Sequence, residues 1–380
     1  MDTRLARGGP AADVLSPDRL SSHHHAPAVT ADHLPAFGSV RASPAPGRRL
    51  LARALARPSL AALVGLVVVV VLFGLRAPEL LTVGGLASVL DVAALLGIGG
   101  VPVALLLIAG QFDLSIGVIS VASSLVTALL IQYAGWGIWP ALLASLAVAL
   151  AIGLVNGLLV VSTGVPSFLV TLATFLVLQG TALAGTQRAT GSARIEGLDS
   201  ASGWQSAAAV FGSTLHIGDG RFRVSLLWWL GVTAVASWVL WRTRFGNSVF
   251  ASGGARRAAR ELGVPVRRTT VTLFCLTAVA GWLLGTLGLV RLSGVEVSPG
   301  LGPDIEFIVV AVIGGCLLTG GYGSAIGAAV GALLYGVVRQ GITLAGWDPR
   351  WFQAFLGVLL LVALLANGVV RRRLKTVPRS

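Results

Sequence analysis

Long runs of apolar residues, separated by short polar or glycine-containing gaps, recur along the chain from Ser59 onward. Each run consists mainly of Leu, Val, Ala, Ile and Gly, and most are long enough to cross about 30 Å of hydrocarbon. Inside lipid the backbone polar groups must be satisfied within the segment, so the pattern predicts helices. We expect these helices near 59–75, 86–108, 115–133, 138–161, 166–185, 225–241, 270–290, 305–319, 324–344 and 351–370.

The composition also places the chain in a membrane. Of its 380 residues, 55% are hydrophobic and 11% are charged, whereas an average globular protein has about 25% charged residues. A soluble domain of this size would lack the polar residues to cover its core. Cys275 and Cys316 both lie in apolar stretches, so no disulfide framework is predicted.

The net charge of +13 comes mainly from arginines in the gaps between apolar runs. Nucleic-acid binding would need basic groups on one face, whereas gap positions are typical of membrane topology, in which basic loops stay in the cytoplasm. With ten spans, the basic clusters at 48–57, 242–268 and 371–375 fall on one side. We therefore predict an all-α polytopic membrane protein of about ten transmembrane helices with cytoplasmic N- and C-termini.

The ends of the chain differ from the rest. Residues 1–50 are rich in Ala, Pro, Arg and His without an apolar period, which predicts a disordered cytoplasmic tail. A transmembrane domain is expected over 51–372 and a cytoplasmic C-terminal tail over 373–380. The run His23–His25 would suit a metal ion, but biased composition explains it more simply, and no metal site is predicted.

The longest gap on the predicted exterior side is 186–224, which is polar and carries both signs of charge. Two interpretations are about equally favoured: an exterior loop that meets a soluble partner, or an insertion that is merely tolerated.

The chain shows no motif for nucleotide chemistry. The loop G-x-x-x-x-G-K-[ST], which binds the phosphates of ATP, is missing, and no catalytic constellation is visible. We predict that the chain is not an enzyme and binds no cofactor itself. If ATP drives its work, the ATPase is another chain.

Two acidic residues lie within or between the apolar runs. Asp91 is inside the run 86–108, and Asp113 lies between that run and the next. An Asp at mid-bilayer costs about 2.5–3.5 kcal/mol on insertion scales, so it normally faces protein or water. For Asp113, capping of the following helix and a place on a transport pathway are equally favoured and compatible. For Asp91 we expect a structural hydrogen bond within the bundle.

Ser167, Thr171 and Thr174 share one face of the helix predicted at 166–185. This neutral stripe, with Phe168 beside it, suits passage of an uncharged hydroxylated solute and equally suits hydrogen bonds between helices. The residues that we assign to a translocation pathway are Asp113, Ser115, Asn156, Ser167, Phe168, Thr171 and Asp304.

Glycines interrupt the apolar pattern at two corresponding places. The stretch 110–117 resembles 320–327, and a run rich in small residues follows each. Paired interruptions in two halves of a transporter point to the region where the halves meet, although chance explains the match equally well in so glycine-rich a chain. We assign helix breaks or close packing to Gly110, Gly117, Gly314, Gly315, Gly320 and Gly321.

The gap 242–268 gives the strongest local signal. Arg256 to Leu262 is good helix material, with Gly254 before it and Gly263 to end it. A short basic helix at the membrane surface would dock in a cleft of a cytosolic partner or lie on anionic lipid. We call residues 253–263 the basic segment; its predicted contact residues are Gly253, Gly254, Arg256, Arg257, Ala258, Ala259, Arg260, Glu261 and Gly263.

Four stretches resemble, in the same order, the permease subunits of bacterial ABC importers for monosaccharides, the ribose, xylose and fructose group. They are 110–117, 243–263, 304–324 and 351–367, and the resemblance covers about residues 55–372. It implies a homodimeric or pseudo-dimeric pore in the cell membrane and a sugar-binding protein outside the cytoplasm. It also implies a cytosolic ATPase that holds ATP and Mg²⁺ and docks on the basic segment. Ala255 and Asp304 depart from the residues usual in such permeases, which are Asn or another polar residue and Glu.

We therefore predict that the 51–372 permease domain imports a monosaccharide. Within the ABC class, a nucleoside, an autoinducer or a branched-chain amino acid is the alternative cargo. A stand-alone secondary transporter is the rival of a different class, with Asp91 or Asp113 as its ion-coupling site. A membrane scaffold without transport activity fits intramembrane acids poorly.

Overall fold

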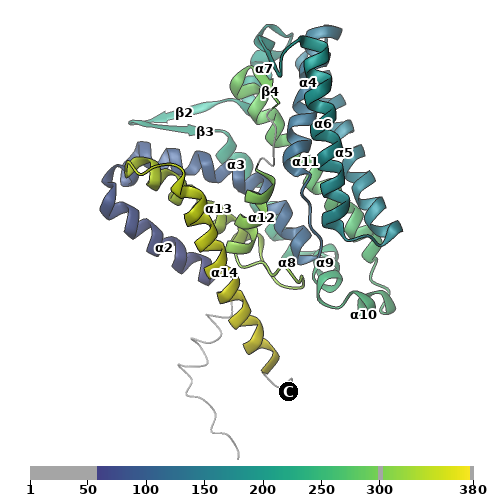
Figure 1. The fold of residues 1–380 in the computed structure, drawn as a ribbon, viewed down its shortest axis with the longest axis vertical. Helices are drawn as coiled ribbons and strands as arrows, with labels where there is room; N and C mark the ends of the chain where they lie inside the picture. The colour runs from purple at the N-terminus through teal and green to yellow at the C-terminus, as the bar shows by residue number, and fades with distance from the viewer. Residues whose placement is uncertain (1–57, 298–302, 377–380) are drawn as a thin grey trace, which may run out of the picture. The chain divides into compact units, whose positions relative to one another are not determined.

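The structure is a computed structural model, and it describes residues 58–297 and 303–376 (Figure 1). The predicted N-terminal tail and its His23–His25 run lie outside the described residues. The helices are α2 (Pro58–Arg76), η2 (Pro78–Leu81), α3 (Val83–Ile108), α4 (Ile116–Ala134), α5 (Ile138–Thr163), α6 (Ser167–Thr190), η3 (Leu198–Ser200), α7 (Trp204–Phe211), α8 (Ser225–Arg242), α9 (Arg244–Gly254), α10 (Arg256–Glu261), α11 (Val266–Leu292), α12 (Asp304–Ile313), α13 (Ala325–Leu344) and α14 (Trp351–Thr376). The strands are β1 (Arg194–Glu196), β2 (Thr214–Ile217), β3 (Gly220–Arg223) and β4 (Gly294–Glu296).

Six of the described helices are long and apolar enough to cross a membrane: α3, α4, α5, α6, α11 and α13. Each coincides with one of the predicted spans. The remaining predicted spans correspond to α2, α8, α12 and α14, which are also helical. The chain is therefore mostly helical, and at least six of its helices have the length and composition of membrane spans.

The prediction for 305–319 was wrong at its C-terminal end. Helix α12 stops at Ile313, because Gly314 and Gly315 follow, and Gly315 has a φ of +93°. A helix of 10 residues is about 15 Å long at 1.5 Å per residue, which is half the thickness of the hydrocarbon core. The apolar residues after Gly315 form a turn instead, and this turn ends where Ser324 caps α13.

Helix α3 is central to the described fold. It packs against α13, α8, α12 and α11, and α11 packs in turn against α5 and α4. Helices α4, α5, α6 and α11 lie side by side in Figure 1. Close approach depends on small residues, as in other membrane bundles: methyl groups at Gly97 and Gly99 would overlap the side chains of Trp229 and Phe307.

The polar gap 186–224 contains regular secondary structure. It contains η3, the short amphipathic helix α7 and the antiparallel hairpin β2–β3, in which Leu215 pairs with Phe222. Strand β1 pairs with β4, so that Ile195 lies opposite Val295 and ties the end of α6 to the end of α11. The fold is thus mainly helical, with two two-stranded sheets among the described residues.

Candidate functional site

The loop 109–115 between α3 and α4 carries a buried carboxylate. Asp113 is 1% exposed. Its Oδ1 accepts hydrogen bonds from the backbone N–H of Ser115 at 2.8 Å and the Ser115 hydroxyl at 2.6 Å. Its Oδ2 accepts from the Thr277 hydroxyl of α11 at 2.6 Å. Asp113 therefore fixes Ser115, the residue just before α4, and links it to α11, but it accepts no hydrogen bond from an N–H group inside α4.

Asn156 of α5 extends these contacts to two further helices. Its Nδ2 donates to Ser115 Oγ at 3.0 Å, and its Oδ1 accepts from the Thr174 hydroxyl of α6 at 2.6 Å. Asn156 and Ser115 are both fully buried. A buried polar group that loses its hydrogen-bond partner costs about 1–3 kcal/mol of stability. Removing one side chain from these contacts should therefore also destabilise the partners that it leaves unpaired.

The polar stripe of α6 faces the same loop, as its spacing predicts. Ser167 Oγ accepts from the Phe112 backbone N–H at 2.9 Å, and Thr171 Oγ1 accepts from the Leu114 backbone N–H at 3.1 Å. Two main-chain donors of the loop thus find side-chain partners one helical turn apart. We call the connected residues the Asp113 network; they are Asp113, Ser115, Asn156, Ser167, Thr171, Thr174 and Thr277.

Two residues assigned to the pathway lie apart from this network. Asp304, at the start of α12, is 1% exposed and accepts a hydrogen bond from the backbone N–H of Gly117 in α4. Phe168 is 43% exposed, and its side chain forms none of the network's hydrogen bonds. The structure therefore brings five of the seven assigned residues together, and their part in translocation stays a prediction.

The glycine segments at 110 and 320 meet in space. Gly110 has a φ of +72° and Gly320 a φ of +78°, and a methyl group on Gly320 would lie 2.8 Å from the Cα of Gly110. The N–H of Gly321 donates to the carbonyl of Ile108 at 2.7 Å. The two interrupted segments are therefore in direct contact, and whether their sequence match reflects a repeat stays open.

Helix α9, which the sequence analysis does not predict, also packs against these glycine segments. A methyl group on Gly253 would overlap the carbonyl oxygen of Ile108 and lie 2.6 Å from the N of Gly321. We call this meeting of the main chains at Ile108, Gly253 and Gly321 the glycine junction. It joins the basic segment directly to the loop that carries Asp113.

The helix predicted within the basic segment is confirmed. Helix α10 spans Arg256–Glu261, and Gly263 follows it with a φ of +78°. Ala255 separates α10 from α9 because its extended backbone breaks the helix. Ala259 is buried, so one apolar side of α10 rests on the protein.

The arginines of α10 line a hollow of about 620 Å³ with residues of the 109–115 loop and of the turn between α5 and α6. Its lining includes Arg256, Arg257, Arg260, Ser167 and Phe168. Burial, and then the neighbouring charge of Arg260, lower the pKa of Arg256 below its usual value. A guanidinium is not deprotonated in proteins, so Arg256 keeps its charge and the hollow favours an anionic group.

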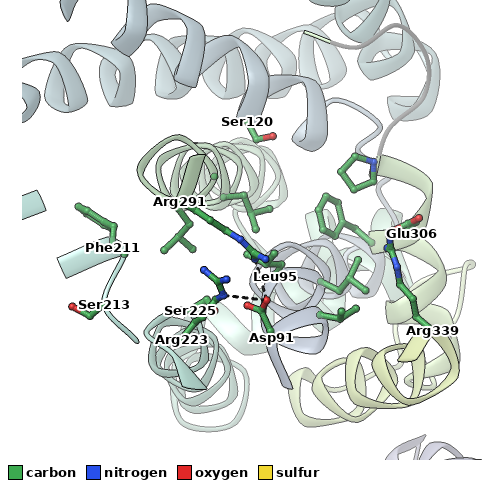
Figure 2. A pocket seen from close by; sticks show the side chains of 18 residues that line it. Asp91, Leu95, Ser120, Phe211, Ser213, Arg223, Ser225, Arg291, Glu306 and Arg339 are labelled. Carbon is green, nitrogen blue, oxygen red and sulfur yellow. Dashed lines mark hydrogen bonds and ion pairs between the residues drawn. The ribbon is translucent and has the colours of Figure 1, made fainter. Parts of the chain in front are cut away.

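A second cavity, of about 420 Å³, lies between α3, α8, α11, α12 and α13 (Figure 2). Its walls are mostly apolar, but five charged side chains line it: Asp91, Arg223, Arg291, Glu306 and Arg339. We call it the Asp91 cavity. Glu306 and Arg339 interrupt apolar runs, as Asp91 does, and such interruptions are a sequence signal for a functional site within a membrane bundle.

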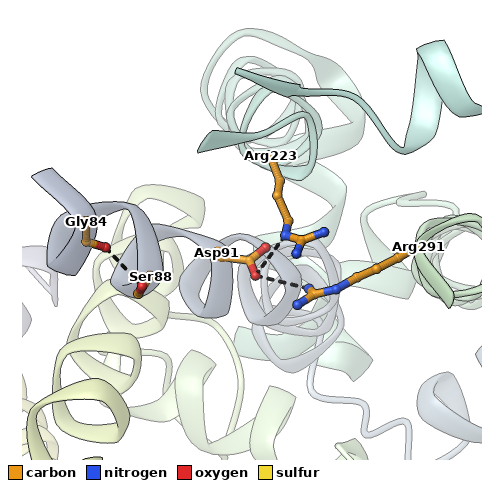
Figure 3. A network of polar contacts seen from close by, with 5 residues as sticks. All are labelled: Gly84, Ser88, Asp91, Arg223 and Arg291. Carbon is orange, nitrogen blue, oxygen red and sulfur yellow. Dashed lines mark hydrogen bonds and ion pairs between the residues drawn. The ribbon is translucent and has the colours of Figure 1, made fainter. Parts of the chain in front are cut away.

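Asp91 makes the structural hydrogen bond expected for it, with Arg291 of α11, and its carboxylate also forms ion pairs with Arg291 and Arg223 (Figure 3). Its Oδ2 lies 3.0 Å from Arg291 Nη1 and 3.3 Å from Arg223 Nε. Arg291 comes from the end of α11, and Arg223 from the end of β3 just before α8. One carboxylate oxygen therefore joins three elements at the wall of the cavity.

The comparisons with known proteins agree on one family. A model of the family described as "Branched-chain amino acid transport system / permease component" matches residues 85–364. The chain is 32% identical to the fructose import permease protein FrcC of Rhizobium meliloti over 75% of this chain and 78% of that one. It is 27% identical to the ribose import permease protein RbsC of Escherichia coli K12, over 80% and 92%. It is 29% identical to the autoinducer 2 import system permease protein LsrD of Salmonella paratyphi B, over 79% and 88%. No solved structure matches the chain significantly.

Proposed function

Because this chain belongs to the ABC-importer permease family of branched-chain amino acid and monosaccharide transporters, and is a multi-pass protein of the cytoplasmic membrane, we propose that it is the membrane subunit through which an ATP-driven importer carries a monosaccharide. One observation carries the choice of cargo. The similarity to the fructose import permease extends over 78% of that protein, so it involves the transport domain as a whole and not one motif.

The energy source in this proposal is a separate ATPase that holds ATP and Mg²⁺, since the chain has no phosphate-binding loop of its own. The basic segment is its docking site. Helix α10 presents Arg256, Arg257 and Arg260 around one hollow, and a charged concave surface is a favourable target for an acidic partner. The pore is a homodimer or pseudo-dimer, and a sugar-binding protein delivers the cargo from outside.

In this proposal the chain crosses the membrane ten times, at α2 and α14 among others, and one crossing combines the short helix α12 with the turn that follows it. The three arginine-rich clusters then face the cytoplasm together with both termini, and the segment holding α7 and the β2–β3 hairpin faces outward. The transport domain spans 51–372, with cytoplasmic tails at 1–50 and 373–380. Cysteine labelling with a membrane-impermeant reagent tests this topology at Ser200 on the exterior side and Ser248 on the cytoplasmic side.

Reconstitution tests the function. Proteoliposomes that contain this chain, its ATPase and its binding protein should take up a monosaccharide when ATP is present in the ATPase compartment. Proteoliposomes with this chain alone should take up none under a proton or sodium gradient. Gradient-driven uptake by the chain alone would show a secondary transporter instead.

A second cargo class is supported by one observation, the similarity to an autoinducer 2 import permease over 88% of that protein. The same proteoliposomes decide between the classes when they are offered autoinducer 2, nucleosides and branched-chain amino acids beside the sugars. We expect uptake of a monosaccharide and of none of these three.

A further inference from the structure

The Asp91 cavity concentrates charge in a setting where charge is costly. Four of its five charged side chains lie on α3, α11, α12 or α13, and the fifth, Arg223, precedes α8 directly. Ionisable residues within membrane helices are expensive, and they normally mark ion or substrate routes. A volume of about 420 Å³ is within the range of about 300–1,000 Å³ usual for small-molecule sites. Both features indicate a ligand.

Asp91 holds the guanidinium groups of Arg223 and Arg291 in place, but most of their N–H groups have no acceptor within the described residues of the protein. Asp91 Oδ2 engages one nitrogen of Arg291 and one of Arg223. A guanidinium carries five N–H donors in a rigid fork, and the two side chains remain 38% and 32% exposed. In the part of the chain that the structure describes, no other acceptor is recorded for these two guanidiniums. Most of their donors therefore stay available beside the cavity.

The charge of the lining restricts the ligand further. Three arginines and two carboxylates, the latter from Asp91 and Glu306, leave one excess positive charge. A cationic ligand is therefore disfavoured. Hydroxyl oxygens accept from guanidinium N–H groups, and hydroxyl hydrogens can be donated to a carboxylate such as Glu306. Apolar walls around Leu95 and Phe307 suit the C–H faces of a ring.

We propose that the Asp91 cavity binds one neutral polyhydroxylated ligand of monosaccharide size, through hydrogen bonds from Arg223 and Arg291 to its hydroxyl groups. Asp91 is the positioning residue, because it orients both guanidiniums without needing to touch the ligand. This assignment rests on the proposed function and gives it a location.

The first test measures uptake kinetics in the assembled importer. Arg291→Gln and Arg223→Gln should each raise the KM for the transported sugar about tenfold, with a kcat that changes far less. Asp91→Asn should act on KM in the same direction, because both guanidiniums lose their common anchor. The matched control is Arg350→Gln, an exposed arginine in the turn before α14, which should leave KM unchanged.

The second test detects occupancy directly and does not depend on the arginines. Gly288 lines the cavity on α11 and has open space where a side chain would go, so Gly288→Cys should fold normally. In a full-length chain with Cys275→Ala and Cys316→Ala, the transported sugar should slow labelling of this cysteine by a soluble maleimide at least severalfold. Ser200→Cys, in η3 and away from the cavity, is the control that sugar should not protect.

The outcomes separate this proposal from the function on which it rests. If the importer carries a monosaccharide, but the sugar gives no protection at Gly288→Cys and the arginine variants keep the wild-type KM, the cavity assignment is overturned and the function stands. If the complete importer carries no monosaccharide at all, the function fails, and the assignment of a sugar to this cavity fails with it. Protection together with a raised KM supports both.

Discussion

The carboxylate of Asp304 accepts a hydrogen bond from the backbone N–H of Gly117 across 187 positions of sequence, with an N–O distance of 2.5 Å. The first N–H groups of a helix have no partner within the helix. Helix α4 therefore obtains part of its N-terminal cap from α12, and the two helices share one buried contact. Because Asp304 is 1% exposed, water does not replace this contact when it is lost.

Asp304→Ala should reduce the free energy of unfolding by about 1–3 kcal/mol, since it leaves a buried N–H group without an acceptor. Asp304→Asn retains a carbonyl oxygen at the same position and should cost clearly less. Thermal unfolding of the purified protein in detergent measures both. Equal losses in the two variants would show that the charge of Asp304, and not its hydrogen bond, stabilises this contact.

Gly253, at the glycine junction, and its neighbour Gly254 should respond differently to substitution by alanine. Gly253→Ala brings a methyl group onto the Ile108 carbonyl, so the main chains must separate, and we expect both reduced stability and reduced ATP-driven uptake. Gly254→Ala meets nothing nearer than 3.9 Å and should be neutral, or slightly stabilising because alanine favours a helix by up to about 1 kcal/mol over glycine. Unfolding and uptake measured side by side test this pair, and equal behaviour of the two variants would contradict the contact.

The double variant Arg256→Glu and Arg257→Glu should abolish association with the ATPase while the protein still inserts in the membrane. Reversing two charges changes a favourable electrostatic match into repulsion. Co-purification of the ATPase with the tagged chain measures the effect, and Arg350→Glu, far along the chain from α10, serves as the control. An ATPase that still co-purifies with the double variant would remove α10 from the docking site.

Asp113→Asn should retain most ATP-driven uptake, within about threefold of the wild type. The amide oxygen still accepts from Ser115, and the Thr277 hydroxyl, which already donates to the Phe274 carbonyl as well, can accept from the new NH₂ group. Asp113→Ala should instead destabilise the protein by about 1–3 kcal/mol, because the donors of Ser115 and Thr277 lose their acceptor. If a folded Asp113→Asn variant transported nothing, the negative charge itself would be required, as it is in an ion-coupled carrier.

The sequence predicts those features that depend on local pattern. Apolar length places the six candidate membrane helices, because no other local signal competes with it. The spacing of Ser167 and Thr171 correctly places them on one face, and the glycines at 254 and 263 correctly bracket α10. Each of these predictions needs only residues that are near one another along the chain.

The remaining features depend on tertiary contacts that no local pattern contains. Asp91 finds Arg223 and Arg291 because three separate elements meet at one wall of a cavity. Hydropathy does not predict that α12 ends at Ile313, because apolar residues continue beyond Gly315. The charges of Glu306 and Arg339 within apolar runs are the one local signal for the Asp91 cavity.

The glycine junction has a mechanical consequence. At Ile108, Gly253 and Gly321, main chain touches main chain, and no side chain lies between them to change rotamer and absorb a displacement. Close-packed interiors have low compressibility and transmit strain. A displacement of α9 therefore acts directly on the 109–115 loop, and the glycine junction couples the basic segment mechanically to the Asp113 network.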